Sequence, residues 1–233
     1  MLRALLLDFG GTLAREVPSR GELYARSARA RGVAIDGDAM GRLMGEVHGE
    51  LPRTVAGRPR YSDPWFERFI DRVFRGRLGL PLEVISEVTR ELFERFSDAR
   101  SFEVLPGARE LLLDARAHGL RTAVVSNWSE HLAELLAALG LLELLDVVIS
   151  SAVLGAEKPD AASFEAALRP LDVAPHAALF VGNDVANDVI GAIQAGIEAV
   201  LVDPSGARAV PSGSLRVASL SQLRPLVLSR ARR

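Results

Sequence analysis

Four short polar clusters contain the residues with which this chain could do chemistry. Each comes at or soon after the end of a short apolar run. Their members are Asp8 in DFGGT, Ser126 and Asn127 in SNW, Lys158 in GAEKPD, and Asn183, Asp184 and Asp188 in VGNDVANDVIGA. If the clusters meet in the fold, a carboxylate, a hydroxyl, an ammonium group and a set of further acids converge on one site.

These groups together describe a phosphoryl-transfer site. A carboxylate such as Asp8 can attack phosphorus and form an acyl phosphate, which divides the displacement into two easier steps. The Ser126 hydroxyl, the Lys158 ammonium and the backbone N–H groups of the glycine-rich turn after Asp8 would bind the phosphoryl oxygens. A Mg²⁺ ion held by acids such as Asp8 and Asp184 would reduce the repulsion between the two anions that must meet.

Lys158 is also the only lysine of the chain, so one of the 28 basic residues is lysine and the rest are arginine. A GC-rich genome by itself produces such an excess of arginine over lysine. A compact ammonium serves where a planar guanidinium does not fit. The single lysine therefore indicates a position that requires an ammonium group.

Short apolar runs rich in β-branched residues predict the strands that would carry these clusters. The expected strands are residues 4–8, 122–126, 147–150, 178–182 and 199–202. Helical patterns of 10 to 15 residues separate the later strands, and this alternation is typical of a doubly wound parallel sheet covered on both faces. In such a sheet the site lies beyond the carboxyl ends of the strands, where the four clusters fall.

Residues 14–100 interrupt the alternation and predict a separate helical domain without strands. Three apolar helical faces can be read there: residues 40–51, 65–73 and 84–96. Residues 56–60, AGRPR, are expected to form a loop. The expected organisation is a core domain of residues 1–13 and 101–233 and an inserted α-helical domain of residues 14–100.

Composition excludes several classes of protein. The formal net charge of the 233-residue chain is −2, so nothing favours nucleic acid or an anionic membrane as a partner. The absence of cysteine excludes disulfides and thiolate metal sites. No apolar segment is long enough for a membrane span, and Asp8 interrupts the only candidate for a signal peptide. A cytoplasmic protein, monomeric or homodimeric, is expected.

The four clusters, in this order, resemble the motifs of the haloacid dehalogenase-like hydrolases. The resemblance covers nearly the whole chain and implies a Rossmann-like core with an inserted helical cap, as in phosphoglycolate phosphatases and haloacid dehalogenases. It implies that Asp8 is the nucleophile and that Lys158 acts with it. Ser126 and Lys158 would bind phosphate, and their neighbours Phe9, Gly10 and Asn127 would complete the substrate site.

The same resemblance implies a Mg²⁺ site made by Asp8, the backbone carbonyl of Gly10 and the acids of the fourth cluster. Phosphatases of the family usually have Gly-Asp after the strand, where this chain has Gly182-Asn183. We expect Asp184 to be the direct ligand, Asn183 an auxiliary one, and Asp188 an indirect one.

Gly10 is a second departure, because phosphatases of the family usually have an aspartate there that protonates the leaving group. General acid–base help of this kind is worth about 10²- to 10⁴-fold. The function expected is a Mg²⁺-dependent phosphatase of a small phosphorylated metabolite. Two alternatives stay open: a 2-haloacid dehalogenase, which needs neither that acid nor a metal, and a non-catalytic protein that binds phosphate for regulation.

Overall fold

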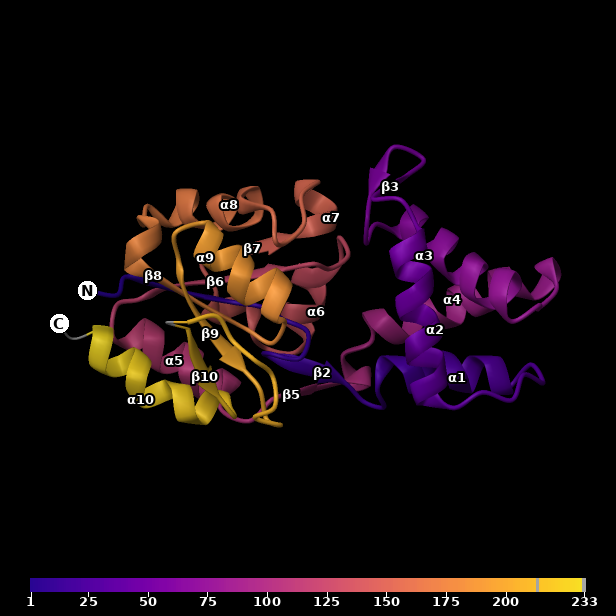
Figure 1. The fold of residues 1–233 in the computed structure, drawn as a ribbon, viewed down its shortest axis with the longest axis horizontal. Helices are drawn as coiled ribbons and strands as arrows, with labels where there is room; N and C mark the ends of the chain where they lie inside the picture. Colours follow the sequence, from indigo (N-terminus) through magenta and orange to yellow (C-terminus); the bar gives the residue numbers. More distant parts are fainter. Residues whose placement is uncertain (213, 232–233) are drawn as a thin grey trace. The chain divides into compact units, whose positions relative to one another are not determined.

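The computed structural model describes residues 1–212 and 214–231, which divide into two compact units (Figure 1). One unit consists of Met1–Arg15 with Val104–Arg233, and the other of Glu16–Glu103. The divisions predicted from the sequence come after residues 13 and 100. The chain passes between the units through two short paired strands, β2 (Ala14–Glu16) and β5 (Phe102–Val104).

The first unit is built on a six-stranded sheet in the order β10-β9-β8-β1-β6-β7, and all neighbouring strands are parallel. This confirms the expected α/β fold class. The strands are β1 (Ala4–Leu7), β6 (Arg121–Ser126), β7 (Val147–Ser150), β8 (Ala178–Gly182), β9 (Glu198–Val202) and β10 (Leu215–Val217). β1 lies in the middle and is buried along its whole length, so the DFGGT turn leaves the sheet at its centre.

Helices cover both faces of this sheet. Figure 1 shows α8 and α9 on one side and α5 and α10 on the other. Phe164 of α8 and Ala192 of α9 belong to one apolar cluster with Leu6 and Phe180 of the strands. The helices are α5 (Ala108–Ala117), α6 (Leu132–Ala138), α7 (Ser151–Leu154), α8 (Ala161–Leu171), α9 (Gly191–Gln194) and α10 (Leu220–Ala231), with short 3₁₀ turns at Leu142–Leu144 and Pro175–Ala177 and a π-helical turn at Val185–Ile190.

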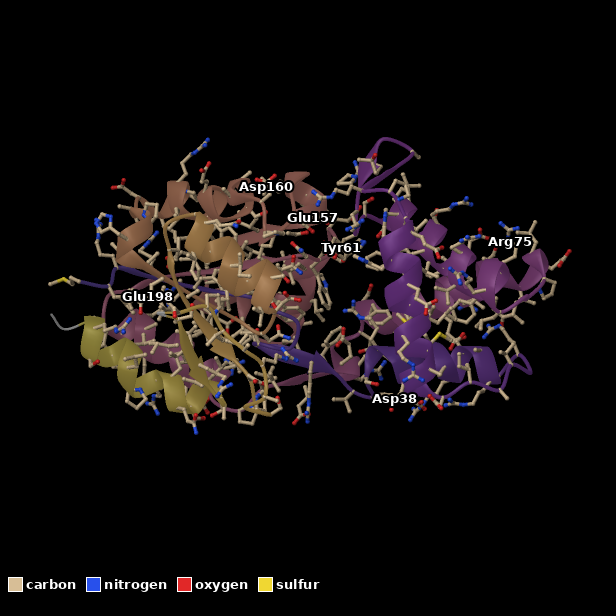
Figure 2. All side chains as sticks on the ribbon, viewed as in Figure 1. Asp38, Tyr61, Arg75, Glu157, Asp160 and Glu198 are labelled. Carbon is tan, nitrogen blue, oxygen red and sulfur yellow. The ribbon has the colours of Figure 1, made fainter. Side chains whose placement is uncertain are left out.

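The second unit is helical and has its own aromatic core. Trp65 and Phe69 stack with centroids 5.4 Å apart, and Tyr24 stacks on Phe74 at 5.8 Å. Charged side chains lie outside, as Arg75, paired with Asp71, does in Figure 2. The helices are α1 (Arg20–Arg29), α2 (Gly37–Glu50), α3 (Asp63–Asp71) and α4 (Ile85–Ser97), with a π-helical turn at Arg72–Arg77 and 3₁₀ turns at Leu82–Val84 and Ala99–Ser101.

The expectation that residues 14–100 lack strands was wrong in two places, since β2 (Ala14–Glu16) begins this stretch and the second unit contains a hairpin. β3 (Thr54–Val55) and β4 (Arg58–Pro59) form a two-stranded antiparallel hairpin. The turn between them places Ala56 and Gly57 at positive φ, 49° and 73°, as the tightest hairpin turns require. Each strand has only two residues, too short for an alternating pattern to appear in the sequence. In the described part of the chain, no helix combines the length and the apolar character that a membrane span needs.

Candidate active site

Asp8, Ser126 and Lys158 meet at the carboxyl end of the parallel sheet. Asp8 follows β1, Ser126 ends the neighbouring β6, and Lys158 lies shortly before α8. Asp8 Oδ1 accepts hydrogen bonds from Ser126 Oγ at 2.9 Å and from Lys158 Nζ at 2.7 Å. All three residues are buried. The nucleophile and the two phosphate-binding groups expected from the sequence are therefore neighbours, with both donors on one oxygen.

Lys158 bridges two carboxylates. Its ammonium lies 2.7 Å from Asp8 Oδ1 and 2.6 Å from Asp188 Oδ1, and it sits over the Phe180 ring at 5.2 Å from the centroid. Burial alone would lower the pKa of Lys158, but Asp8 and Asp188 outweigh it and raise the pKa above its ordinary value. The site therefore has a permanent cation in contact with Asp8.

Asp188 binds Lys158 and also the backbone of its own cluster. Its Oδ2 accepts the backbone N–H groups of Asn183 and Asp184, each at 2.9 Å. Burial raises the pKa of Asp188 to about 6, although the Lys158 ammonium acts in the opposite direction. Gly182 makes the arrangement possible, because a Cβ there would collide with the Asp188 carboxyl group. Both Asp188 oxygens are thus committed to Lys158 and the backbone.

Asp184, the expected direct metal ligand, is an exposed residue at the start of the turn Val185–Ile190. Its side chain is exposed and caps the turn that follows, because Oδ1 accepts the N–H groups of Ala186 and Asn187, each at 2.8 Å. Capping the π-helical turn Val185–Ile190 satisfies backbone donors that would otherwise lack a partner. The backbone of the turn thus uses Asp184 Oδ1, and the role of Asp184 as a metal ligand stays a prediction.

Asn183 occupies the place that we expected Asp184 to take. The carboxamide atom that faces Asp8 lies 3.3 Å from Asp8 Oδ2, 3.0 Å from the Gly10 carbonyl oxygen and 3.2 Å from Thr12 Oγ1. If this atom is the amide nitrogen, it donates to its neighbours. If it is the oxygen, three oxygens of Asn183, Asp8 and Gly10 converge, and a cation among them removes their repulsion.

The residues present fit a Mg²⁺ ion as a small set of hard oxygen donors. Mg²⁺ keeps several waters and uses one or two carboxylates, so Asp8 Oδ2, the Gly10 carbonyl and the Asn183 carboxamide oxygen suffice chemically. Within residues 1–212 and 214–231 there is no cluster of three or more Asp, Glu, His or Cys side chains that could hold a metal. The candidate metal centre thus contains one carboxylate.

Two residues expected at the substrate also stabilise the structure of the site. The Asn127 carboxamide pairs with the backbone of Lys158, donating to its carbonyl at 2.9 Å and accepting from its N–H at 2.8 Å. Asn127 therefore positions Lys158. Phe9 is completely buried, and its carbonyl accepts the N–H groups of Thr12, Leu13 and Ala14, which holds the turn after Asp8.

Sequence reasoning missed two residues of the site. Thr12 lies 3.2 Å from the Asn183 carboxamide, and the Trp128 ring lies against Gly10. Thr12 could have been found as the hydroxyl of the DFGGT stretch itself. Trp128 directly follows Ser126 and Asn127, but nothing in its sequence neighbourhood marks it as a partner of Gly10.

Known proteins with similar sequences and folds were found for nearly the whole chain. A family model described as haloacid dehalogenase-like hydrolase matches residues 2–196. Haloacid dehalogenase-like hydrolase domain-containing protein 3 of Bos taurus is 30% identical over 234 residues, covering 96% of this chain and 93% of its own. Phosphoserine phosphatase of Thermus thermophilus is 34% identical over 254 residues, with coverages of 95% and 98%.

A similar solved structure is a haloacid dehalogenase-type (HAD) phosphatase from Thermococcus onnurineus. It matches with a TM-score of 0.69 and 27% identity, covering 97% of this chain and 98% of its own. The similarity extends through the sheet, the four clusters and the inserted helical unit, since almost the full length of both chains is aligned.

Proposed function

The chain belongs to the haloacid dehalogenase-like hydrolases and is a hydrolase, and from that premise we propose that it is a Mg²⁺-dependent phosphatase of a small phosphorylated metabolite. Relatives named phosphatases support the reaction type. The observation that carries the proposal is that the two carboxylate oxygens of Asp8 have different partners. Oδ1 meets the donors Ser126 and Lys158, and Oδ2 faces the Asn183 carboxamide, which also contacts the Gly10 carbonyl.

The Asp8 carboxylate would attack phosphorus, so that an aspartyl O–P bond forms while the bond to the leaving oxygen breaks. Ser126 and Lys158, which hold Asp8 Oδ1 before substrate binds, would turn toward the phosphoryl oxygens and stabilise their charge. Water would then attack the same phosphorus and release phosphate and free Asp8. Asn127 and Asp188 keep the ammonium in place through both steps.

Asp8 Oδ2, the Gly10 carbonyl and the Asn183 carboxamide oxygen are the proposed Mg²⁺ ligands. When bound, the ion would neutralise charge on the phosphoryl group and on Asp8. Asp184 and Asp188 are not part of this proposed set, because Asp184 Oδ1 caps the turn that follows and both Asp188 oxygens accept from Lys158 and the backbone. A set with a single carboxylate is expected to bind Mg²⁺ more weakly than a set with two.

We also propose that the helical unit selects the substrate. His48 Nε2 and Tyr61 Oη lie 3.1 Å apart, and the Arg60 guanidinium is 5.7 Å from the centroid of the Trp65 ring. Tyr61 has a φ of 72°, and such strain in a residue other than glycine is concentrated at functional sites. Tyr61→Phe should raise KM for the physiological phosphate and leave a small aryl phosphate unaffected.

A 2-haloacid dehalogenase is the second candidate, and one observation favours it. The residue of the fourth cluster that faces Asp8 Oδ2 is an amide, whose nitrogen can take the place of a cation. An Asp8 that attacks carbon and displaces halide needs neither a metal nor a proton donor.

One comparison separates these functions. Purified protein is assayed for phosphate release from p-nitrophenyl phosphate with Mg²⁺ and with EDTA, and for halide release from 2-chloropropionate with EDTA. We expect phosphate release that requires Mg²⁺ and is lost in Asp8→Asn. Halide release without metal would establish the dehalogenase. Binding of phosphate without either reaction would establish a regulatory protein.

A further inference from the structure

Gly10 has no side chain, and the Trp128 ring lies where a side chain at position 10 would point. A Cβ built on Gly10 would lie 3.0 Å from Trp128 Cζ3, 3.8 Å from Cε3 and 3.9 Å from Cη2. Residue 10 does not need glycine for its backbone, since the positive φ in this turn belongs to Gly11, at 81°. A side chain at position 10 would therefore press on the indole, with which even one carbon is in tight contact.

Trp128 is held firmly in this place. Its backbone N–H donates to Ser151 Oγ at 3.1 Å, and its carbonyl accepts from Ser150 Oγ at 2.9 Å and from Ala152 N at 3.2 Å. Its ring meets the buried Phe9 ring edge to face, with centroids 4.9 Å apart and an angle of 85°. The serines at the end of β7 and the residue after Asp8 thus fix the backbone and the ring.

No acid is bonded to Asp8 among the described residues of the first unit, so none is held on it to protonate a departing oxygen. Among the described residues of the first unit, the side chains bonded to Asp8 Oδ1 are Ser126 and Lys158, which the proposed reaction uses on the phosphoryl group. Asp188 accepts hydrogen bonds with both oxygens, so it has no proton to give. At the edge of the site where position 10 would place a carboxyl group, the surface is the Trp128 ring.

We propose that Trp128 makes this enzyme selective for phosphates whose leaving group departs as a stable anion, namely aryl, enol and acyl phosphates. The inference rests on the proposed phosphatase function. In the first step the Asp8 O–P bond forms and the P–O bond to the leaving group breaks, so that the electron pair leaves on a phenolate, enolate or carboxylate oxygen without a proton. In the second step water displaces Asp8 from phosphorus, and its protons pass to phosphate and solvent.

The indole also provides a contact that an aryl leaving group can use. An aromatic ring packs against the indole in an offset-stacked or edge-to-face arrangement. An alkyl alcohol gains neither this contact nor a proton. Trp128 is thus a specificity-determining residue, which acts by contact with the leaving group and by keeping an acid out.

The test measures how kcat/KM depends on the basicity of the leaving group. Substituted phenyl phosphates, acetyl phosphate and glycerol 2-phosphate are compared in the unaltered protein, Gly10→Asp, Trp128→Ala and Gly10→Asp/Trp128→Ala, with folding checked by thermal melting. We expect a steep fall with basicity in the unaltered protein. The double variant should gain about 10²-fold or more on glycerol 2-phosphate relative to p-nitrophenyl phosphate, and Gly10→Asp alone should gain little.

The unaltered protein decides the matter even if the variants do not fold. A kcat/KM that is the same for p-nitrophenyl phosphate and glycerol 2-phosphate would overturn the inference, since a proton donor would then be present. An equal gain in Gly10→Asp with Trp128 retained would overturn the role of the ring. If no phosphate ester or anhydride is hydrolysed with Mg²⁺ present, the proposed phosphatase function itself fails.

Discussion

Lys158 Nζ lies 2.7 Å from Asp8 Oδ1, on the same oxygen that Ser126 Oγ approaches to 2.9 Å. The side chain that reaches this oxygen is almost completely buried and touches a second carboxylate, Asp188, at 2.6 Å. An ammonium can point its three donors at several partners in so small a space, whereas a guanidinium is a planar fork.

Lys158→Arg should therefore lose activity although it keeps the charge. The longer, planar side chain cannot contact Asp8 and Asp188 together without moving one of them. We expect kcat to fall by about 10²- to 10³-fold, the size typical of losing one preorganised donor, and Lys158→Met to fall at least as far. Steady-state kinetics with p-nitrophenyl phosphate measures both. Near-normal turnover in Lys158→Arg would remove the ammonium from the reaction.

Asn183→Asp should strengthen the proposed metal centre. It would place a second carboxylate 3.3 Å from Asp8 Oδ2 and 3.0 Å from the Gly10 carbonyl. Without metal the two carboxylates repel, so the unfolding temperature should fall below that of the unaltered protein. With Mg²⁺ the order of the two unfolding temperatures should reverse. The Mg²⁺ concentration that gives half-maximal activity should fall by about tenfold or more.

Asn187→Asp is the matched control for that variant, because it adds the same charge to the same cluster outside the Asp8 contact. Its response to Mg²⁺ should equal that of the unaltered protein. One result would directly contradict the proposed Mg²⁺ site. If the unaltered protein is fully active in EDTA and Mg²⁺ does not change its unfolding temperature, the Asn183 amide nitrogen occupies the place of the cation.

The fourth cluster offers a second matched pair, Asp188→Asn and Asp184→Asn. In Asp188→Asn an amide nitrogen must face either the Lys158 ammonium or the backbone N–H groups of Asn183 and Asp184, so a donor meets a donor. Breaking a buried ion pair in this way costs about 3–5 kcal/mol. Asp184→Asn keeps a good helix cap and should change stability by less than about 0.5 kcal/mol. Urea unfolding measures both values.

The same pair tests which acid belongs to the site. Asp188→Asn should also abolish turnover, because Lys158 loses the partner that holds it beside Asp8. Asp184→Asn should keep both turnover and its Mg²⁺ dependence. If instead Asp184→Asn raises the Mg²⁺ concentration needed for activity, Asp184 is a ligand and its cap contacts do not persist during turnover.

The sequence was sufficient for five of the six strands of the sheet and for the residues at its centre. Apolar runs at residues 4–8 and 178–182 predicted β1 (Ala4–Leu7) and β8 (Ala178–Gly182) because parallel strands buried on both faces are continuously apolar. The position of Asp8, Ser126 and Lys158 at the carboxyl ends followed from the same topology. β10 (Leu215–Val217) was missed, since a three-residue edge strand leaves no such run.

Orientation within the fourth cluster could not be predicted in the same way. Asp184 and Asp188 are equally acidic in the sequence, and helical periodicity alone does not decide which one points inward. The π-helical turn Val185–Ile190 determines the orientation of both residues. Asp184 caps this turn, and the Asp188 carboxyl group packs against Gly182. The contact of Trp128 with Gly10 depends on how the loops that follow two different strands pack together. No local sequence pattern predicts such packing.

His48 of the helical unit should make the protein less stable in acid. Burial lowers the pKa of His48 below its ordinary value, and the nearby Arg60 and Arg20 lower it further. The unfolded chain therefore takes up a proton at a higher pH than the folded chain does. As pH falls from about 6.5, the ordinary histidine value, toward the lower value in the folded state, the free energy of unfolding decreases.

His48→Gln removes this proton uptake and can keep a hydrogen bond to the Tyr61 hydroxyl, which lies 3.1 Å from His48 Nε2. Between about pH 7.5 and about pH 5.5, its unfolding temperature should fall by less than that of the unaltered protein. His176→Gln changes an exposed histidine of the other unit and serves as the control. It should follow the unaltered protein, because the substitution lies at an exposed position of the other unit. Equal acid sensitivity of His48→Gln and the unaltered protein would show that His48 is protonated as easily in the folded unit as in the unfolded chain.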